Sequence, residues 1–134
     1  MYGVLDVSTS ALIAQRTRLD VISANLANKD TLLNAAGEYE PYRRRAVIFA
    51  TGDPARGSAE GVHVARIEID SGPLQPKHEP GSPFADADGY VGYPNVHAVI
   101  EQMNAMEAAR SYEANITAIE ATKSMFSVAL QILR

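Results

Sequence analysis

The feature that most constrains this chain is its C-terminal segment, residues 95–134, which contains neither proline nor glycine. Apolar residues recur there every seven positions, with two more at helical offsets: Tyr112, Ile119, Phe126 and Leu133, then Ile116 and Leu130. The pattern predicts a single helix about 57 Å long. A compact domain of this size has a radius of gyration of about 14 Å, so the rest of the chain cannot enclose such a helix.

A second apolar stripe lies on another side of the same segment, formed by Met103, Met106, Ala118, Ala121, Met125, Ala129 and Ile132. Asn95 follows Pro94 and is the predicted N-cap of the helix. The alternative is two helices joined by a tight turn at residues 108–111. That stretch has no glycine, proline or other turn signal, so we favour one continuous helix.

The N-terminal segment predicts a second helix over residues 4–28, about 37 Å long. Its leucines keep a strict seven-residue spacing, and a weaker column follows three positions later: Leu5, Leu12, Leu19 and Leu26, then Ser8, Gln15 and Ile22. So narrow a stripe indicates packing against another helix. Because this helix is the shorter one, part of the C-terminal helix has no partner within the chain, and covering it requires other chains.

The middle of the chain, residues 29–94, holds all seven prolines and eight of the nine glycines. Two strands are predicted, over residues 45–50 and 61–70, with a loop over 51–60 and an extended, turn-rich stretch over 71–94. The apolar phase changes between Val64 and Ala65, which indicates a bulge or a strand covered on both sides. The predicted fold is α+β in three parts: an N-terminal helix (1–30), a small irregular β-rich domain (31–94) and a long C-terminal helix (95–134).

Composition and charge narrow the function. Hydrophobic residues make up 46% of the chain, cysteine is absent and the formal net charge is −4. The basic run Arg43–Arg45 is too short for a nucleic-acid interface and is interpreted as a solvated strand edge or a subunit contact. No stretch is apolar enough to span a membrane. The N-terminus lacks the features of a cleaved secretory signal, so we expect the protein either to stay inside the cell or to leave it by a route that retains the N-terminus.

No catalytic, cofactor or metal site is predicted. The run Asp86-Ala87-Asp88-Gly89 lacks the first carboxylate and the bidentate glutamate of a calcium loop, and is interpreted as a turn. The three histidines have no metal-ligand spacing, and there is no nucleophile elbow or phosphate-binding glycine loop. The sequence therefore favours a protein that is not an enzyme.

The end of the N-terminal helix resembles the signature S-x-N-[I/L]-A-N-x-x-T of the flagellar rod, hook and hook-associated proteins. The matching residues are Ser23, Asn25, Leu26, Ala27, Asn28 and Thr31. Residues 85–91, 93–96, 109–115 and 123–125 are also similar to blocks of the proximal rod proteins in this family. The resemblance extends over nearly the whole chain.

The resemblance implies a structural subunit of the proximal rod, in the basal body, that carries torque to the hook and is needed for motility. Its two helices would form an inner coiled-coil layer and its middle an outer layer. Its partners would be copies of itself, other proteins of the proximal and distal rod, and the junction of rod base and export gate. It would cross the cytoplasmic membrane through the flagellar type III export apparatus without cleavage of a signal.

Two other functions stay open at this point: a helical adaptor or chaperone with a single partner, and another axial protein of the same family. Residues predicted to form helix and subunit contacts are Leu5, Leu12, Leu19, Ile22, Tyr112, Ile116, Ile119, Met125, Phe126, Leu130 and Leu133. Asn25, Asn28 and Thr31 are predicted to cap the first helix, to contact subunits, or both. Charged residues such as Glu107 are candidates for ion pairs between subunits.

Overall fold

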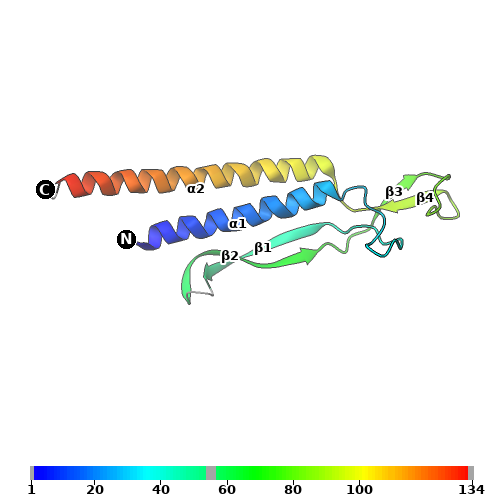
Figure 1. Cartoon of the computed structure of the whole chain (residues 1–134), viewed down its shortest axis with the longest axis horizontal. Coiled ribbons are helices and arrows are strands. Elements are labelled where there is room, and N and C mark those ends of the chain that lie inside the picture. The colour runs from blue at the N-terminus through cyan, green and yellow to red at the C-terminus, as the bar shows by residue number, and fades with distance from the viewer. Residues whose placement is uncertain (1, 54–56, 133–134) are drawn as a thin grey trace.

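The computed structural model describes residues 2–53 and 57–132. The elements in chain order are α1 (Tyr2–Ala27), β1 (Arg45–Asp53), β2 (Ser58–Ile69), β3 (Gln75–His78), β4 (Tyr90–Tyr93) and α2 (Ala98–Ile132). The molecule is elongated, with two long helices side by side and two β-hairpins (Figure 1). The predicted α+β class, with terminal helices and a β-containing middle, is confirmed.

Helix α2 is continuous over 35 residues, about 52 Å, so the alternative of two helices with a turn at residues 108–111 is wrong. The predicted N-cap is also wrong. The first helical hydrogen bond runs from the Glu101 amide to the His97 carbonyl, at 2.9 Å, which places His97 at the N-cap. The side chain of Asn95 instead bonds the backbone of the β1–β2 hairpin.

The two helices run antiparallel. Arg18 Nη2 lies 3.2 Å from Glu107 Oε2, and Asn25 Nδ2 lies 3.0 Å from Glu101 Oε2, so rising numbers on α1 meet falling numbers on α2. Ala108, on the side of α2 that faces α1, is fully buried, and a small side chain there allows close approach of the helices. Figure 1 shows α2 continuing well past the N-terminal end of α1.

Strands β1 and β2 form a twisted antiparallel hairpin. Ile48 pairs with Arg66 but Phe49 pairs with Val64, so Ala65 is the extra residue of a β-bulge. The predicted bulge is therefore confirmed. Both strands extend into the predicted loop, and their pairing shifts register between Thr51 and Asp53, at Gly52, whose φ of 87° favours glycine.

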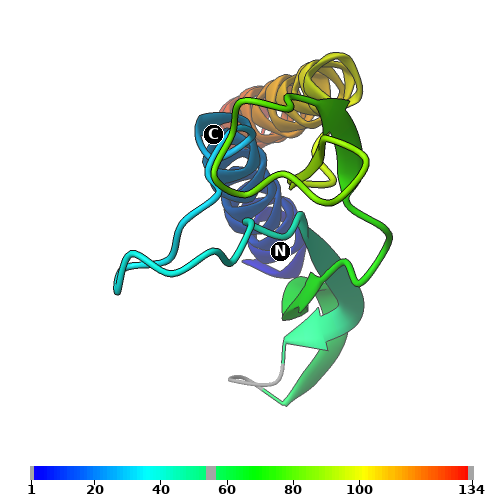
Figure 2. The same cartoon turned by 90° about the vertical axis from the view of Figure 1, so that its right-hand side faces the viewer.

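The β1–β2 hairpin packs along α1, which lies between it and α2 (Figure 2). The closest approach is at Gly61, where an added Cβ would lie 2.8 Å from Ser10 Oγ. Ser10 Oγ also accepts a hydrogen bond from the Val62 amide at 3.1 Å. A hydroxyl in the middle of a helix thus satisfies a strand N–H, which holds the hairpin parallel to the helix pair.

The β3–β4 hairpin was not predicted, because residues 71–94 read only as extended and turn-rich. Each strand has four residues and β3 contains Pro76, so neither shows a strand-like alternation. The hairpin projects beyond the ends of the helices (Figure 1). Tyr39, from the α1–β1 connection, holds it in place by stacking on Phe84 at 5.1 Å and by bonding the Gly92 carbonyl at 2.8 Å.

The hydrophobic core is small for a chain with this much apolar sequence. Among the described residues, the buried apolar side chains are Ala14, Ile22, Val91, Pro94, Val96 and Ala108. Many larger apolar side chains on α2 are more than half exposed. A large apolar surface of the chain is therefore left uncovered, which is typical of a protein that binds other chains.

Candidate functional site

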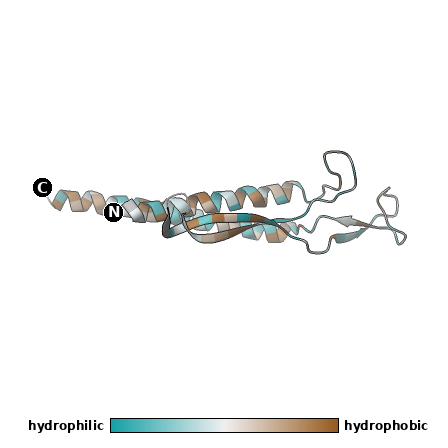
Figure 3. Ribbon diagram, turned by 90° about the horizontal axis from the view of Figure 1, so that it is seen from below, coloured by the Kyte–Doolittle hydropathy of each residue, from teal (hydrophilic) through white to brown (hydrophobic). Residues whose placement is uncertain are grey.

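The first functional surface is an apolar stripe on α2. Val99, Met103 and Met106 are 70%, 60% and 57% exposed, at the i, i+4, i+7 spacing of one helix face. Met125 and Ile132 are similarly exposed at the other end of the helix. Figure 3 shows hydrophobic segments recurring along α2 to its free end. The expectation that the second stripe lacks a partner within the chain is confirmed for these residues.

The predicted contact residues fall into two groups. Ile22 is buried, and most of the others are half-buried along the helix pair: Leu5, Leu12, Leu19, Tyr112, Ile116, Ile119 and Phe126. Met125 and Leu130, near the C-terminal end of α2, are 65% and 67% exposed. Leu133 lies outside the described residues. The structure thus brings the first group together within the chain and leaves Met125 and Leu130 free to contact neighbours.

The second feature is a polar junction where both helices meet the open end of the β1–β2 hairpin, centred on Asn25. The Asn25 side chain is fully buried. Its Nδ2 donates to the Arg45 carbonyl (2.8 Å) and to Glu101 Oε2 (3.0 Å). Its Oδ1 accepts from the Arg45 amide (2.9 Å) and from the Tyr42 hydroxyl (3.0 Å). Every hydrogen-bonding position of the carboxamide is therefore occupied.

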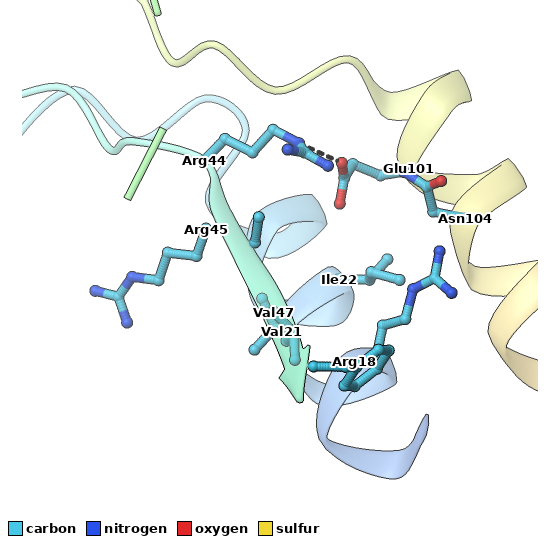
Figure 4. A pocket seen from close by; sticks show the side chains of 10 residues that line it. Arg18, Val21, Ile22, Arg44, Arg45, Val47, Glu101 and Asn104 are labelled. Atoms are coloured by element: carbon cyan, nitrogen blue, oxygen red, sulfur yellow. Dashed lines mark hydrogen bonds and ion pairs between the residues drawn. The ribbon is translucent and has the colours of Figure 1, made fainter. Parts of the chain in front are cut away.

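Glu101 carries the negative charge of this junction and is only 1% exposed. Arg44 Nε donates to its Oε1 at 2.7 Å, and the position of Glu101 in the first turn of α2 also favours a carboxylate (Figure 4). Burial, and secondarily the Glu101 charge, raise the pKa of Tyr42 against the opposing effect of Arg45, so the hydroxyl stays protonated and can donate. A groove of about 350 Å³ opens beside this pair, between β1, α1 and α2.

Asn95 plays a matching part in the junction. Its Oδ1 accepts from the Arg44 amide (2.9 Å) and its Nδ2 donates to the Asp70 carbonyl (3.2 Å). The Asp70 amide in turn donates to the Arg44 carbonyl at 2.8 Å. Asn95 therefore closes the open end of the β1–β2 hairpin and ties it to the start of α2.

Capping explains part of the signature at the end of α1. Asn28 Nδ2 donates to the Ala24 carbonyl at 2.8 Å, and Thr31 Oγ1 donates to Asn28 Oδ1 at 3.2 Å. Asn25 does not cap the helix, because its side chain bonds β1 and α2. The remaining residues of the signature are exposed (Ser23 and Ala27) or half-buried (Leu26).

Several contacts of the junction were missed from the sequence. Arg44 was interpreted as solvated or as a subunit contact, yet it pairs with Glu101 of its own chain, and Arg43 Nη1 donates to the Gly72 carbonyl. Glu107, a candidate for pairing between subunits, pairs with Arg18. Glu101 and Asn95 gave no signal beyond an acid and an amide near a helix start, and their role depends on residues far away in the chain.

A further polar cluster lies on the β3–β4 hairpin. Lys77 Nζ is 2.7 Å from Glu79 Oε1, and the Tyr93 hydroxyl donates to Glu79 Oε2 at 3.0 Å. These hydrogen bonds lower the pKa of Glu79 and raise the pKa of Lys77 and of Tyr93. The cluster fastens the two short strands to each other.

The described residues show no arrangement typical of catalysis. They contain no group of three His, Asp or Glu side chains placed to hold a metal ion. Asp86 Oδ1 accepts from the amides of Asp88 and Tyr90, as in a turn. In the same part of the chain, no helix combines the length and apolarity needed to cross a membrane.

Comparison with known proteins identifies the class of protein to which this chain belongs. Residues 5–32, on α1, match the family described as flagella basal body rod protein. Residues 87–132, mostly on α2, match the family described as flagellar basal body rod FlgEFG protein C-terminal. The two helices and the junction residues Asn25, Asn95 and Glu101 all lie within these matches. The fold is that of a flagellar basal-body rod protein.

The whole chain also aligns with curated relatives. It is 44% identical to the flagellar basal-body rod protein FlgC of Salmonella typhimurium, over 93% of this chain and 92% of the relative. It is 42% identical to FlgC of Bacillus subtilis (96% and 95%) and 40% identical to FlgC of Borreliella burgdorferi (100% and 98%). The chain belongs to the FlgC family of flagellar basal-body rod proteins.

Proposed function

We propose that this chain is a structural subunit of the proximal rod of the bacterial flagellum, and that it is not an enzyme. It assembles helically with copies of itself and with other proteins of the proximal and distal rod, and it transmits torque towards the hook. The observation that carries the proposal is the long helix α2 with its exposed apolar surface. This surface consists of Val99, Met103 and Met106 near one end and Met125 and Ile132 near the other.

The geometry supports an assembly that continues in one direction. The two exposed regions of α2 lie at opposite ends of the helix, along the long axis of the molecule (Figure 1). Contacts that join unlike surfaces of successive copies produce open helical assemblies, whereas contacts between like surfaces close into dimers. An elongated subunit with apolar surface at both ends of its long helix fits the first kind of assembly.

The test is a strain that lacks its own copy of this gene. We expect the strain to be non-motile, and the unmodified chain to restore swimming and to co-purify with basal bodies. A helical adaptor or chaperone would restore swimming but would be absent from purified basal bodies. That result would contradict the proposal.

We also propose export through the flagellar type III apparatus with the N-terminus retained. Deletion of residues 1–30 is then expected to abolish both export and incorporation, since it removes α1 and Asn25 together. The mass of the N-terminal peptide of chain recovered from basal bodies checks the second point. A peptide that begins well inside α1 would show that a signal had been cleaved.

A further inference from the structure

The four hydrogen bonds of the Asn25 carboxamide reach more than one element. Two of them bond the amide and the carbonyl of Arg45, at 2.9 and 2.8 Å. In an antiparallel ladder this is how a residue of a neighbouring strand bonds its partner. Asn25 therefore takes the place of a strand residue at the free edge of β1, and it fixes which residue of β1 lies against the end of α1.

The other donor of Asn25 reaches α2, at Glu101 Oε2. A carboxylate that is 1% exposed must be fully hydrogen-bonded to stay charged at low cost. Its two oxygens accept from Asn25 on α1 and from Arg44 at the start of the hairpin. If either donor moves away, a buried charge loses a partner.

We propose that Asn25 is a positioning residue whose hydrogen bond to Glu101 couples the docking of α1 on α2 to the register of the β1–β2 hairpin on α1. Each helix adopts its native position only when it is packed on the other. The β1–β2 hairpin has its native register on α1 only when both helices are in place. The evidence for this coupling is the set of hydrogen bonds within the chain. A further consequence is that only a subunit with this arrangement of helices and hairpin fits into the rod, and this consequence rests on the proposed function.

Reversing the polarity of the Asn25–Glu101 bond tests the coupling. In Asn25→Asp, a second carboxylate faces Glu101 and the donor is lost. In Glu101→Gln, an amide N–H group faces a donor either at Asn25 or at Arg44. In the double variant, the new amide at position 101 donates to the new carboxylate at position 25 and still accepts from Arg44. The bond to the Arg45 carbonyl is lost in Asn25→Asp and in the double variant alike, because a carboxylate oxygen then faces that carbonyl.

The measurement is the urea unfolding equilibrium of the purified chain near neutral pH, with amide hydrogen exchange at Arg45. Each single variant is expected to raise the unfolding constant about tenfold or more, and to speed exchange at Arg45 by a similar factor. The double variant is expected to lose clearly less than the sum of the two single variants, because it restores a hydrogen bond between positions 25 and 101. Asn28→Asp is the matched control, because Asn28 does not contact Glu101 and its effect should simply add to that of Glu101→Gln.

Single variants without effect, or a double variant as unstable as the sum of the two, would overturn the proposal. These readouts do not depend on assembly. If the unmodified chain is absent from basal bodies, the proposed function fails while the coupling is still judged by the unfolding data. If the double variant is stable and enters basal bodies whereas the single variants do not, both the coupling and the proposed function are supported.

Discussion

Arg44, at the start of the β1–β2 hairpin, donates from Nε to Glu101 Oε1 on the first turn of α2, over 2.7 Å. The Arg44 side chain is 28% exposed and that of Glu101 is 1% exposed, so the pair lies at the edge of the interior. Removing one partner of a buried ion pair leaves the other charge unsatisfied, which makes this contact one of the most sensitive in the chain.

Arg44→Ala is therefore expected to destabilise the chain by about 3 kcal/mol, the lower end for a buried pair. Arg45→Ala is the matched control. Arg45 is exposed and its guanidinium lies 5.5 Å from the centre of the Tyr42 ring, a contact that contributes about 0.5–1 kcal/mol. Urea unfolding followed by circular dichroism measures both, and equal losses would contradict the assigned role of Arg44.

The register shift near the end of β1 depends on Gly52. Its φ is 87°, and an added Cβ would lie 2.7 Å from the Ser58 carbonyl oxygen. Gly37 has a similar φ of 80° but open space around the added Cβ. Gly37→Ala is expected to cost about 1–2 kcal/mol for the backbone conformation alone, and Gly52→Ala clearly more. Losses of the same size in the two unfolding curves would rule out the steric contribution.

Replacing Gln15 is expected to increase the stability of the chain, in contrast to the variants above. Its Oε1 is buried without a hydrogen-bond partner, at a seam position of α1. Replacing an unsatisfied polar group by an apolar one of similar shape removes a desolvation penalty. Gln15→Met is expected to stabilise the chain by about 1 kcal/mol in the same unfolding assay. A loss of stability would indicate that the amide is satisfied in solution.

The Lys77–Glu79–Tyr93 cluster makes the β3–β4 hairpin sensitive to pH. Because the folded state lowers the pKa of Glu79, its contribution is present above the ordinary value of 4.5 and is lost as the pH falls through the lower folded pKa. The pKa of Tyr93 is raised, so its contribution is present below 10.0 and is lost as the pH rises through the folded pKa.

The hairpin should therefore be most stable between these two limits. The stability difference between the unmodified chain and Glu79→Gln is expected to be constant from about pH 5 to pH 10 and to shrink on both sides. Carboxyl and tyrosine chemical shifts measured through a pH titration check the two directions. A Glu79 carboxyl that titrates above 4.5 would contradict the assigned hydrogen bonds.

The exposed stripe on α2 predicts variants that affect assembly and not folding. Met103→Lys and Met106→Lys change side chains that are already 60% and 57% exposed, so the unfolding free energy should move by less than about 0.5 kcal/mol. Incorporation into basal bodies and swimming should fall sharply, because each places a charge in an apolar contact. Gln102→Lys, an exposed position on another side of the same turn, is the control and should be tolerated.

An element could be predicted from the sequence where its pattern lies within one continuous stretch of the chain. The continuity of α2 follows from a seven-residue repeat uninterrupted by glycine or proline, and the bulge at Ala65 from a change of apolar phase within one strand. Both patterns are contained in a few consecutive turns or residues. The β3–β4 hairpin lacks such a pattern, since its strands are short and Pro76 interrupts one of them.

The polar junction could not be assembled from the sequence because its parts are distant in the chain. Asn25, Arg44, Asp70, Asn95 and Glu101 come together only once the helices are antiparallel and the hairpin is folded back. The signature at the end of α1 identified Asn25 as notable but not its partners. Glu101 lies on the face of α2 that packs on α1, but a glutamate among the apolar and small residues of such a face has no local mark that distinguishes it from a solvated one.

The most direct test of the account is a density map of purified basal bodies from a strain that carries this chain. We predict that α1 and α2 lie in the inner layer of the proximal rod, with the Met103 and Met106 face covered by a helix of a neighbouring subunit. A rod without this chain, or a rod in which that face of α2 is open to solvent, would contradict it.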